Sequence, residues 1–322
     1  YVRPKRAKRP ANRPKWPSNS FRRRVWATCF FEIHDPGAFD EHFFNGLLNV
    51  VVDHQAFRSI RDACRDLIHT MRTLRSPSGI LIFAEPGMGK TLLLDLIDRE
   101  FSKASDQEGN CLKIALDGAI DQRGIAAAMT LALGYPALPS RPTLVALNHM
   151  ANIGLSRRRP AALLVDEMQH VCEGHKDITA RASTDWLKVR MDTFNFPVIG
   201  AGTRVLERLA ALNPQFVSRA SASYVIRPFA LDDHWRQLLA AFSQSVQSVD
   251  LSIVNTTACR PLHIASAGNM RLLKRILTYA CMHAATQPQK VVTMESLSKG
   301  LRDSKGEVSE QSDPFLRGRP GG

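Results

Sequence analysis

Apolar residues along the chain fall into two patterns, short continuous runs and longer stretches at helical spacing. A continuous run of about four to eight residues is typical of a strand buried in a sheet, and such runs occur at 79–84, 111–116, 161–165 and 196–203. Helical spacing predicts helices at 39–52, 55–74, 92–97, 125–133, 143–155 and 204–212. Because strands alternate with helices, the pattern predicts an α/β domain with a parallel sheet and helices on both faces.

A helical part follows this domain, with amphipathic helices predicted at 232–247, 251–258, 269–285 and 294–301. Residues 302–322 have little apolar content, so we expect a disordered tail there. Its apolar spot at 313–316 is either a docking peptide for a partner or a segment without function. The expected organisation is a basic arm (1–28), an α/β domain (29–230), a helical lid (231–301) and the tail (302–322). The α/β domain is expected to start with a short extended segment at 29–33.

Positive charge is concentrated near the start of the sequence. The 322 residues carry a formal net charge of +13, and residues 1–24 contain ten Lys or Arg and no Asp or Glu. A basic arm interrupted by proline cannot bury enough apolar surface to fold alone, but its cations can neutralise phosphates. The arm therefore favours a nucleic-acid partner, and the alternative is a solvated, solubilising tail.

The remaining composition is typical of a soluble globular protein, with 44% hydrophobic and 23% charged residues. No apolar run approaches the roughly 20 residues needed to cross a bilayer, and the arm is not followed by the apolar stretch of a secretion signal. The six cysteines form no C-x-x-C pair, which argues against a zinc site or a disulfide framework. We therefore expect a cytoplasmic protein without a membrane partner.

The run at 79–84 ends in a glycine-rich loop that enters a helix. The loop consists of Ala84-Glu85-Pro86-Gly87-Met88-Gly89-Lys90-Thr91, which matches G-x-x-x-x-G-K-[ST] except that Ala84 replaces the first glycine. Backbone N–H groups of such a loop and of the following helix start bind phosphate oxygens, so Glu85 to Leu92 are candidate contacts for ATP. Lys90 is expected to reach the β- and γ-phosphates, and Thr91 to ligate Mg²⁺. The alternative is a structural turn before a helix.

Polar residues end two other predicted strands. Asp166 and Glu167 directly follow the run at 161–165, and Thr203 ends the run at 196–203. Burial of the strand places the carboxylates at the carboxyl edge of the sheet. Asp166 is a candidate Mg²⁺ ligand and Glu167 a candidate to polarise the water that attacks the γ-phosphate; the alternative is an Asp-Glu helix cap. Thr203 is a candidate sensor of the γ-phosphate, a helix cap, or both.

With these motifs in this order, the chain resembles the AAA+ superfamily and, within it, the TniB/TnsC-type ATPase regulators of Tn7-like DNA transposition. The resemblance covers roughly residues 30–300. Besides the phosphate loop it rests on Asp166-Glu167-Met168-Gln169-His170, Gly200-Ala201-Gly202-Thr203, Asn213-Pro214-Gln215-Phe216-Val217-Ser218-Arg219 and Gly268-Asn269-Met270-Arg271. It implies an AAA+ P-loop domain with a five-stranded parallel sheet, a small C-terminal helical lid, and Mg²⁺-dependent ATP hydrolysis used as an assembly switch.

The resemblance also assigns roles to arginines. It implies that Arg219 acts in trans on the ATP of a neighbouring subunit, and that Arg271 reaches from the lid to the γ-phosphate as a second sensor. A trans-acting arginine implies a homo-oligomer, either a ring or a helical filament with a hexameric or heptameric repeat. Double-stranded DNA would run through its centre without sequence preference, past segments that hold Arg123 and the run Arg157, Arg158 and Arg159. The alternative is that these arginines are simply solvated.

Two functions remain open. The resemblance implies a bacterial, cytoplasmic regulator of transposition that oligomerises on target DNA, recruits transposase subunits and links them to a target-selector protein of the TniQ type. The alternative is an AAA+ initiator, loader or secretion-type ATPase that acts on a protein complex. ATP-dependent, sequence-independent DNA binding would favour the first function.

Overall fold

The structure of the protein, a computed structural model, describes residues 54–316 apart from 75–76, 104–109, 119–120, 137, 139–140, 174–176, 247 and 307. The basic arm at 1–28, the extended segment at 29–33 and the helix expected at 39–52 lie outside the described residues. Among the described helices, none is long and apolar enough to cross a bilayer.

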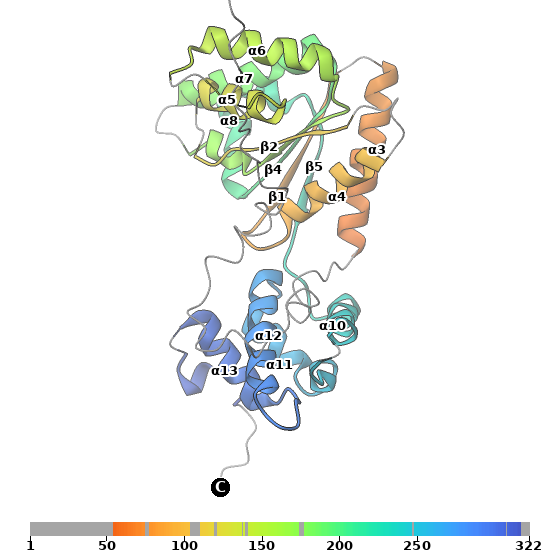
Figure 1. Ribbon diagram of the computed structural model, residues 1–322, viewed down its shortest axis with the longest axis vertical. Helices are drawn as coiled ribbons and strands as arrows, with labels where there is room; N and C mark the ends of the chain where they lie inside the picture. The colour runs from red at the N-terminus through yellow and green to blue at the C-terminus, as the bar shows by residue number, and fades with distance from the viewer. Residues whose placement is uncertain are drawn as a thin grey trace, which may run out of the picture. The chain divides into compact units, whose positions relative to one another are not determined.

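Five strands form one sheet in the order β2-β3-β4-β1-β5 (Figure 1). The strands are β1 (Gly79–Ala84), β2 (Leu112–Ala115), β3 (Leu163–Asp166), β4 (Val198–Gly202) and β5 (Ala220–Ile226). Every neighbouring pair is parallel, which confirms the expected five-stranded parallel sheet. Because the strands run in one direction, β1, β3 and β4 end at the same edge of the sheet. The phosphate loop, the two carboxylates and Thr203 follow these three strand ends.

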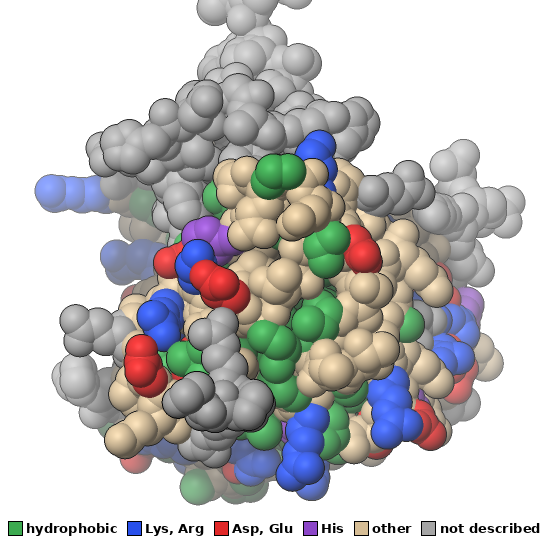
Figure 2. All heavy atoms as spheres, turned by 90° about the horizontal axis from the view of Figure 1, so that it is seen from below, with side chains coloured by type: hydrophobic (Ala, Val, Ile, Leu, Met, Phe, Trp, Pro, Cys, Tyr) green, Lys and Arg blue, Asp and Glu red, His purple; other side chains and the backbone are tan. Residues whose placement is uncertain are grey.

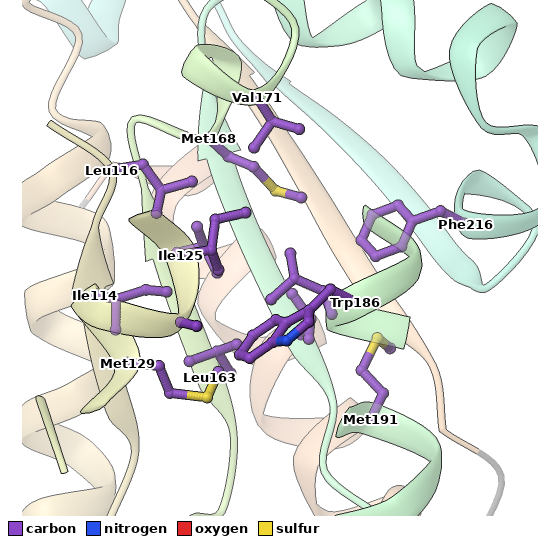
Figure 3. Packing of buried hydrophobic residues seen from close by; sticks show 14 of the residues in the cluster. Ile114, Leu116, Ile125, Met129, Leu163, Met168, Val171, Trp186, Met191 and Phe216 are labelled. Carbon is purple, nitrogen blue, oxygen red and sulfur yellow. The ribbon is translucent and has the colours of Figure 1, made fainter. Parts of the chain in front are cut away.

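Helices cover both faces of the sheet, and each face has its own core. Leu81 and Phe83 of β1 pack on one face with Trp186, and Figure 3 shows part of this core. Ile80 and Ile82 pack on the other face with residues of the helices before and after β1. The helices of this domain, with η for 3₁₀ turns, are α3 (Gln55–Leu74), α4 (Lys90–Lys103), α5 (Gln122–Ala132), α6 (Leu144–Arg158), η1 (Met168–Val171), α7 (Asp177–Phe194), η2 (Arg204–Arg208), α8 (Leu209–Leu212) and α9 (Pro214–Val217).

The longest elements of this domain that the apolar pattern does not predict are β5 and α7. The edge strand β5 consists mainly of alanine and serine at its start, and its residues alternate between half-buried and exposed. The helix α7 buries Ser183, Thr184 and Arg190 beside its apolar residues. Polar residues therefore occupy core-facing positions of α7 and interrupt the apolar period that identifies an amphipathic helix.

The lid is helical, as expected. It contains α10 (Asp233–Ser245), η3 (Ser252–Asn255), α11 (Cys259–Ser266), α12 (Met270–Ala285) and α13 (Met294–Lys305). The helix expected at 251–258 is instead the short turn η3, and α11 follows it. The helices α12 and α13 approach closely at Gly300, where a Cβ would lie 2.6 Å from the carbonyl oxygen of Ile276. On the face seen in Figure 2, hydrophobic side chains lie among charged ones, as is normal at a protein surface.

The end of the described chain packs against α13, which corrects the expected disordered tail. Asp313 and Phe315 are 0% and 4% exposed. The Asp313 carboxylate accepts hydrogen bonds from the Ser298 hydroxyl at 2.6 Å and from the Phe315 backbone N–H at 2.9 Å. A buried carboxylate and one phenyl ring hold the segment, and such contacts leave no periodic apolar pattern. The expectation of disorder is therefore wrong for the described residues between 302 and 316.

We predict that Asp313→Ala lowers the free energy of unfolding by about 2 kcal/mol or more, because it leaves the buried Ser298 hydroxyl without its acceptor. Glu310→Ala is the matched control, since Glu310 is an exposed acidic residue of the same segment, and it should change stability by less than about 0.5 kcal/mol. Urea unfolding of the full chain measures both. Equal stability of the two variants would contradict the packing described for Asp313.

Candidate nucleotide-binding site

The phosphate loop leaves the carboxyl end of β1 and enters α4 at Lys90. Gly87 and Gly89 have φ angles of 85° and 86°, which residues with side chains rarely adopt. There is also no room for a side chain, since a Cβ at Gly87 would lie 2.7 Å from Cβ of Arg271 and one at Gly89 would lie 2.9 Å from the ring of Phe57. At these two glycines the loop has only backbone atoms, and it leads into a helix N-terminus. This arrangement binds phosphate.

Lys90 is the central cation of this site. It is 6% exposed, and its Nζ donates a hydrogen bond to the carbonyl oxygen of Ala84 at 3.1 Å. Burial lowers the pKa of Lys90, the nearby Glu167 and Asp166 oppose that shift, and Arg271 adds to it. The carboxylates at the end of β3 and Arg271 of the lid therefore both influence the charge of Lys90.

Ala84 stands where the phosphate-loop motif has its first glycine. It is the last residue of β1 and is buried, and it is not among the residues with a positive φ. The position therefore requires neither the conformational freedom nor the small size of glycine. The departure from the motif leaves the loop geometry intact.

The residues present fit the phosphates of a nucleotide together with Mg²⁺. The first N–H groups of α4 have no partner within the helix, and Lys90 supplies positive charge. Thr91 on α4 and Asp166 on β3 supply oxygen atoms of the type that Mg²⁺ prefers. Among the other predicted loop contacts, Glu85 and Pro86 are exposed, Leu92 is half-buried, and Met88 is buried in the core.

The two carboxylates directly follow one another at the end of β3. Asp166 is 4% exposed, and its Oδ1 accepts a hydrogen bond from the Glu167 N–H at 3.0 Å. Glu167 has φ 53° and ψ 37°, a left-handed conformation that is uncommon for residues other than glycine. It precedes η1, but its side chain makes no capping hydrogen bond. Its Oε2 instead accepts a hydrogen bond from the side-chain amide of Gln169.

Thr203 directly follows β4, and the side chain of Gln169 links it to the Glu167 carboxylate. Its backbone N–H donates to Oε1 of Gln169 at 3.1 Å, and its side chain makes no capping hydrogen bond to η2. The capping alternative for the Thr203 hydroxyl is therefore not realised in this structure. The position remains suited to a sensor of a bound phosphate.

The start of α12 in the lid contacts the phosphate loop. The Asn269 side-chain amide donates to the carbonyl oxygen of Pro86 at 2.9 Å, and the Arg271 backbone N–H donates to that of Gly87 at 3.2 Å. The Arg271 side chain is exposed. The sequence-predicted Arg271 thus lies beside the loop, and Asn269 fixes the helix start there.

Arg219 lies at the opposite edge of the sheet from the phosphate loop. Its carbonyl oxygen accepts hydrogen bonds from the Gly79 N–H and the Ser78 hydroxyl, both at 2.9 Å, where β1 begins. The loop begins where β1 ends, and six residues of strand at about 3.3 Å each put it roughly 20 Å away. The guanidinium of Arg219 bonds Asp192 of α7 at 2.6 and 3.3 Å. Arg219 is therefore not part of the nucleotide site of its own chain.

The arginines predicted to contact DNA are exposed but do not form one cluster. Arg123 is in the first turn of α5, whereas Arg157 and Arg158 end α6. Arg158 donates to the carbonyl oxygen of Ala132 at the other end of α5, at 2.8 Å, and Arg159 follows as the helix cap. The length of α5, at about 1.5 Å per residue, separates the two groups by roughly 14 Å.

Several residues near the site are not assigned by sequence reasoning. Gln169 and Asn269 are marked only by their spacing from Glu167 and Arg271. An aromatic group beside the loop carries no local pattern, because its members come from distant parts of the chain. In it, the ring centroid of His54 lies 4.3 Å from that of Phe57 and 4.9 Å from that of Phe229.

A comparison with protein families decides the family. A model described as "Bacterial TniB protein" matches residues 49–227, which is more than half of the 322 residues. The chain belongs to the TniB family. The TniB match includes the phosphate loop, Asp166, Glu167, Thr203 and Arg219, and it ends before the lid begins. No curated protein matches the sequence.

Solved structures similar to this TniB-family chain have the AAA+ fold of ORC and Cdc6 proteins. The Aeropyrum pernix ORC1 protein in complex with DNA matches with a TM-score of 0.65 and 17% identity, over 82% of this chain and 71% of that chain. The Aeropyrum pernix ORC2 protein in ADPNP-ADP complexes matches with a TM-score of 0.62 and 16% identity, over 86% and 74%. Cdc6p from Pyrobaculum aerophilum matches with a TM-score of 0.60 and 14% identity, over 85% and 73%. At such identities the likeness establishes the fold.

We predict that Lys90→Ala weakens ATP binding by about 10- to 100-fold, since a hydrogen bond to a charged group contributes about 1.5–3 kcal/mol. Lys188→Ala is the control, because Lys188 lies on α7 and its Nζ contacts Gln215. Titration of a fluorescent ATP analogue measures both affinities. Unchanged affinity of Lys90→Ala would contradict the placement of the phosphates at this loop.

Proposed function

We propose that this TniB-family protein is an ATP-dependent regulator of DNA transposition, in which Mg²⁺-dependent ATP hydrolysis controls assembly on target DNA. One observation carries the proposal: in a chain of this family, Lys90, Asp166, Glu167 and Arg271 converge on a phosphate loop of bare backbone. The proposed location is the bacterial cytoplasm.

Each residue of the site has a defined task in this proposal. Lys90 holds the β- and γ-phosphates, and Thr91 and Asp166 hold the Mg²⁺ ion, which offsets negative charge on the phosphates when it is bound. The Glu167 carboxylate orients the attacking water and polarises it by accepting a hydrogen bond from it. Thr203 and Arg271 contact the γ-phosphate, so the end of β4 and the lid respond to its presence.

The proposal includes an oligomer in which Arg219 completes the site of the next subunit. The separation of roughly 20 Å between Arg219 and the loop of the same chain supports this role, because an arginine side chain cannot span it. A planar guanidinium suits the charge that develops during phosphoryl transfer. In the isolated chain, that guanidinium is partly exposed and forms an ion pair with Asp192. The assembly would be a ring or helical filament, hexameric or heptameric.

DNA is the proposed platform for this assembly. Positive charge in the basic arm and at the exposed Arg123, Arg157 and Arg158 supports contact with phosphates, which carries no sequence information. A similar fold, that of the Aeropyrum pernix ORC1 protein, is found in complex with DNA. Assembled subunits would recruit transposase and connect it to a target selector of the TniQ type.

The likeness to ORC and Cdc6 proteins also supports a second candidate, an AAA+ initiator, loader or secretion-type ATPase that acts on a protein complex. The two candidates share the nucleotide site and differ in the role of DNA. An active ATPase that does not bind duplex DNA would favour the second candidate.

We predict that Arg219→Ala loses ATP hydrolysis but keeps ATP binding, because the arginine acts on a neighbouring subunit. Glu167→Gln should bind ATP and hydrolyse it slowly, so its subunits can donate Arg219 without turnover of their own. Mixing the two variants should restore hydrolysis at sites that combine one chain's Glu167 with the other chain's Arg219. Arg236→Ala, which changes an exposed lid arginine, is the control. Mixtures no more active than their components would contradict the trans assignment.

We predict that deleting residues 1–24 weakens binding to random-sequence duplex DNA and flattens its dependence on salt. The logarithmic slope should fall by about 0.9 for each phosphate that the arm no longer neutralises. Arg123→Ala with Arg157→Ala should reduce ATP-dependent assembly on DNA, whereas Arg236→Ala should not. Filter retention of DNA across a salt series measures these effects. An unchanged slope for the deletion and unchanged assembly for the arginine pair would contradict DNA binding by these groups.

A further inference from the structure

Gln169 lies between the two strand ends that the proposed reaction uses. It is the second residue of η1 and is 4% exposed. Its Nε2 donates to Oε2 of Glu167, and its Oε1 accepts from the backbone N–H of Thr203 at 3.1 Å. One buried amide therefore joins the carboxylate after β3 to the end of β4.

The fold makes space for this amide by leaving side chains out of β4. A Cβ at Gly202 would lie 2.8 Å from Oε1 of Gln169 and 3.0 Å from its backbone nitrogen. Two residues earlier on the same face of β4, a Cβ at Gly200 would overlap the sulfur of Met168, and Figure 3 shows Met168 directed into the core. The first two residues of η1 thus rest on two glycines of β4, which fixes η1 against that strand.

The orientation of the Glu167 side chain depends on contacts with η1. Its left-handed backbone costs free energy and persists only where surrounding contacts hold it. Its N–H is bound by Asp166 and its carbonyl oxygen by the N–H of His170 at 3.1 Å. The bond from Gln169 is the hydrogen bond that orients the carboxylate itself. A carboxylate without that bond would be free to rotate away from the water.

We propose that Gln169 is a positioning residue for ATP hydrolysis. Its amide holds the Glu167 carboxylate at a fixed position relative to the Thr203 backbone, so that activation of water by Glu167 depends on the position of Thr203 after β4. The inference rests on the proposed catalytic role of Glu167. Gln169 touches neither the phosphates nor the water in this account. It acts through Glu167, and a shift of Thr203 on contact with the γ-phosphate reaches the carboxylate through the same amide.

The test replaces Gln169 with methionine, which has similar size but neither hydrogen bond. Gln169→Met should lower kcat for ATP hydrolysis about 10- to 100-fold, as expected when a reacting group is misplaced by about 1 Å, and should leave the affinity for ATP within about twofold. Gln122→Met is the control, because Gln122 is a partly buried glutamine whose side chain donates its hydrogen bond to the carbonyl oxygen of Ala182 rather than to a carboxylate. It should leave kcat unchanged.

A double variant separates positioning from a structural role. In a Glu167→Gln background the carboxylate is already absent, so adding Gln169→Met should change kcat less than about twofold, whereas a structural defect would multiply with the first loss. If Gln169→Met does not fold, Gly202→Ala gives the same test, since its Cβ displaces Gln169. Gly154→Ala is its control, because the three atoms nearest to a Cβ there all belong to the Leu133 side chain.

The outcomes distinguish this inference from the proposed function. Normal kcat in Gln169→Met, or losses that multiply in the double variant, would overturn the positioning role while slow hydrolysis by Glu167→Gln upheld the catalytic assignment. Hydrolysis by Glu167→Gln at the unmodified rate would overturn both. Low kcat with retained ATP affinity, together with no added loss in the double variant, is the result that the inference predicts.

Discussion

Parallel pairing of β1, β4 and β3 is the constraint on which the site depends. In the registered pairs, Phe83 of β1 lies beside Gly202 of β4, and Val165 of β3 beside Gly200. Hydrogen bonding between these strands therefore brings their ends to one edge, and the residues that follow them meet there. Phosphate loop, carboxylates and Thr203 are distant in sequence, and the sheet makes them neighbours.

The strand β4, which lies between β1 and β3, also determines how closely η1 packs against the sheet. Because β4 carries glycine at positions 200 and 202, η1 packs directly on it, and Gln169 reaches the residues that follow β3 and β4. The lid adds a contact of a different kind, through Asn269 and the backbone of Arg271 to the loop. In the proposed function, a bound γ-phosphate would influence both the end of β4 and the start of α12, as an assembly switch requires.

Patterns with local causes could be predicted from the sequence. The helix at 55–74, the strand before the phosphate loop and the carboxylates after β3 follow from apolar spacing and from a motif with a physical purpose. The strand β5 and the helix α7 could not be predicted, because β5 is built from small residues at an edge and α7 buries polar side chains. The roles of Gln169 and of the segment around Asp313 could not be predicted, because each depends on contacts with residues that only the fold brings close.

In the proposed assembly, the nucleotide site is completed across a subunit boundary on DNA. Its most direct test is an electron-microscopy reconstruction of the full chain with random-sequence duplex DNA and a non-hydrolysable ATP analogue. We expect a ring or helical filament around the duplex, with Arg219 of each subunit facing the γ-phosphate held by the Lys90 loop of the next. Nucleotide-bound subunits that remain single on DNA, or an assembly in which Arg219 points away from the neighbouring nucleotide, would contradict it.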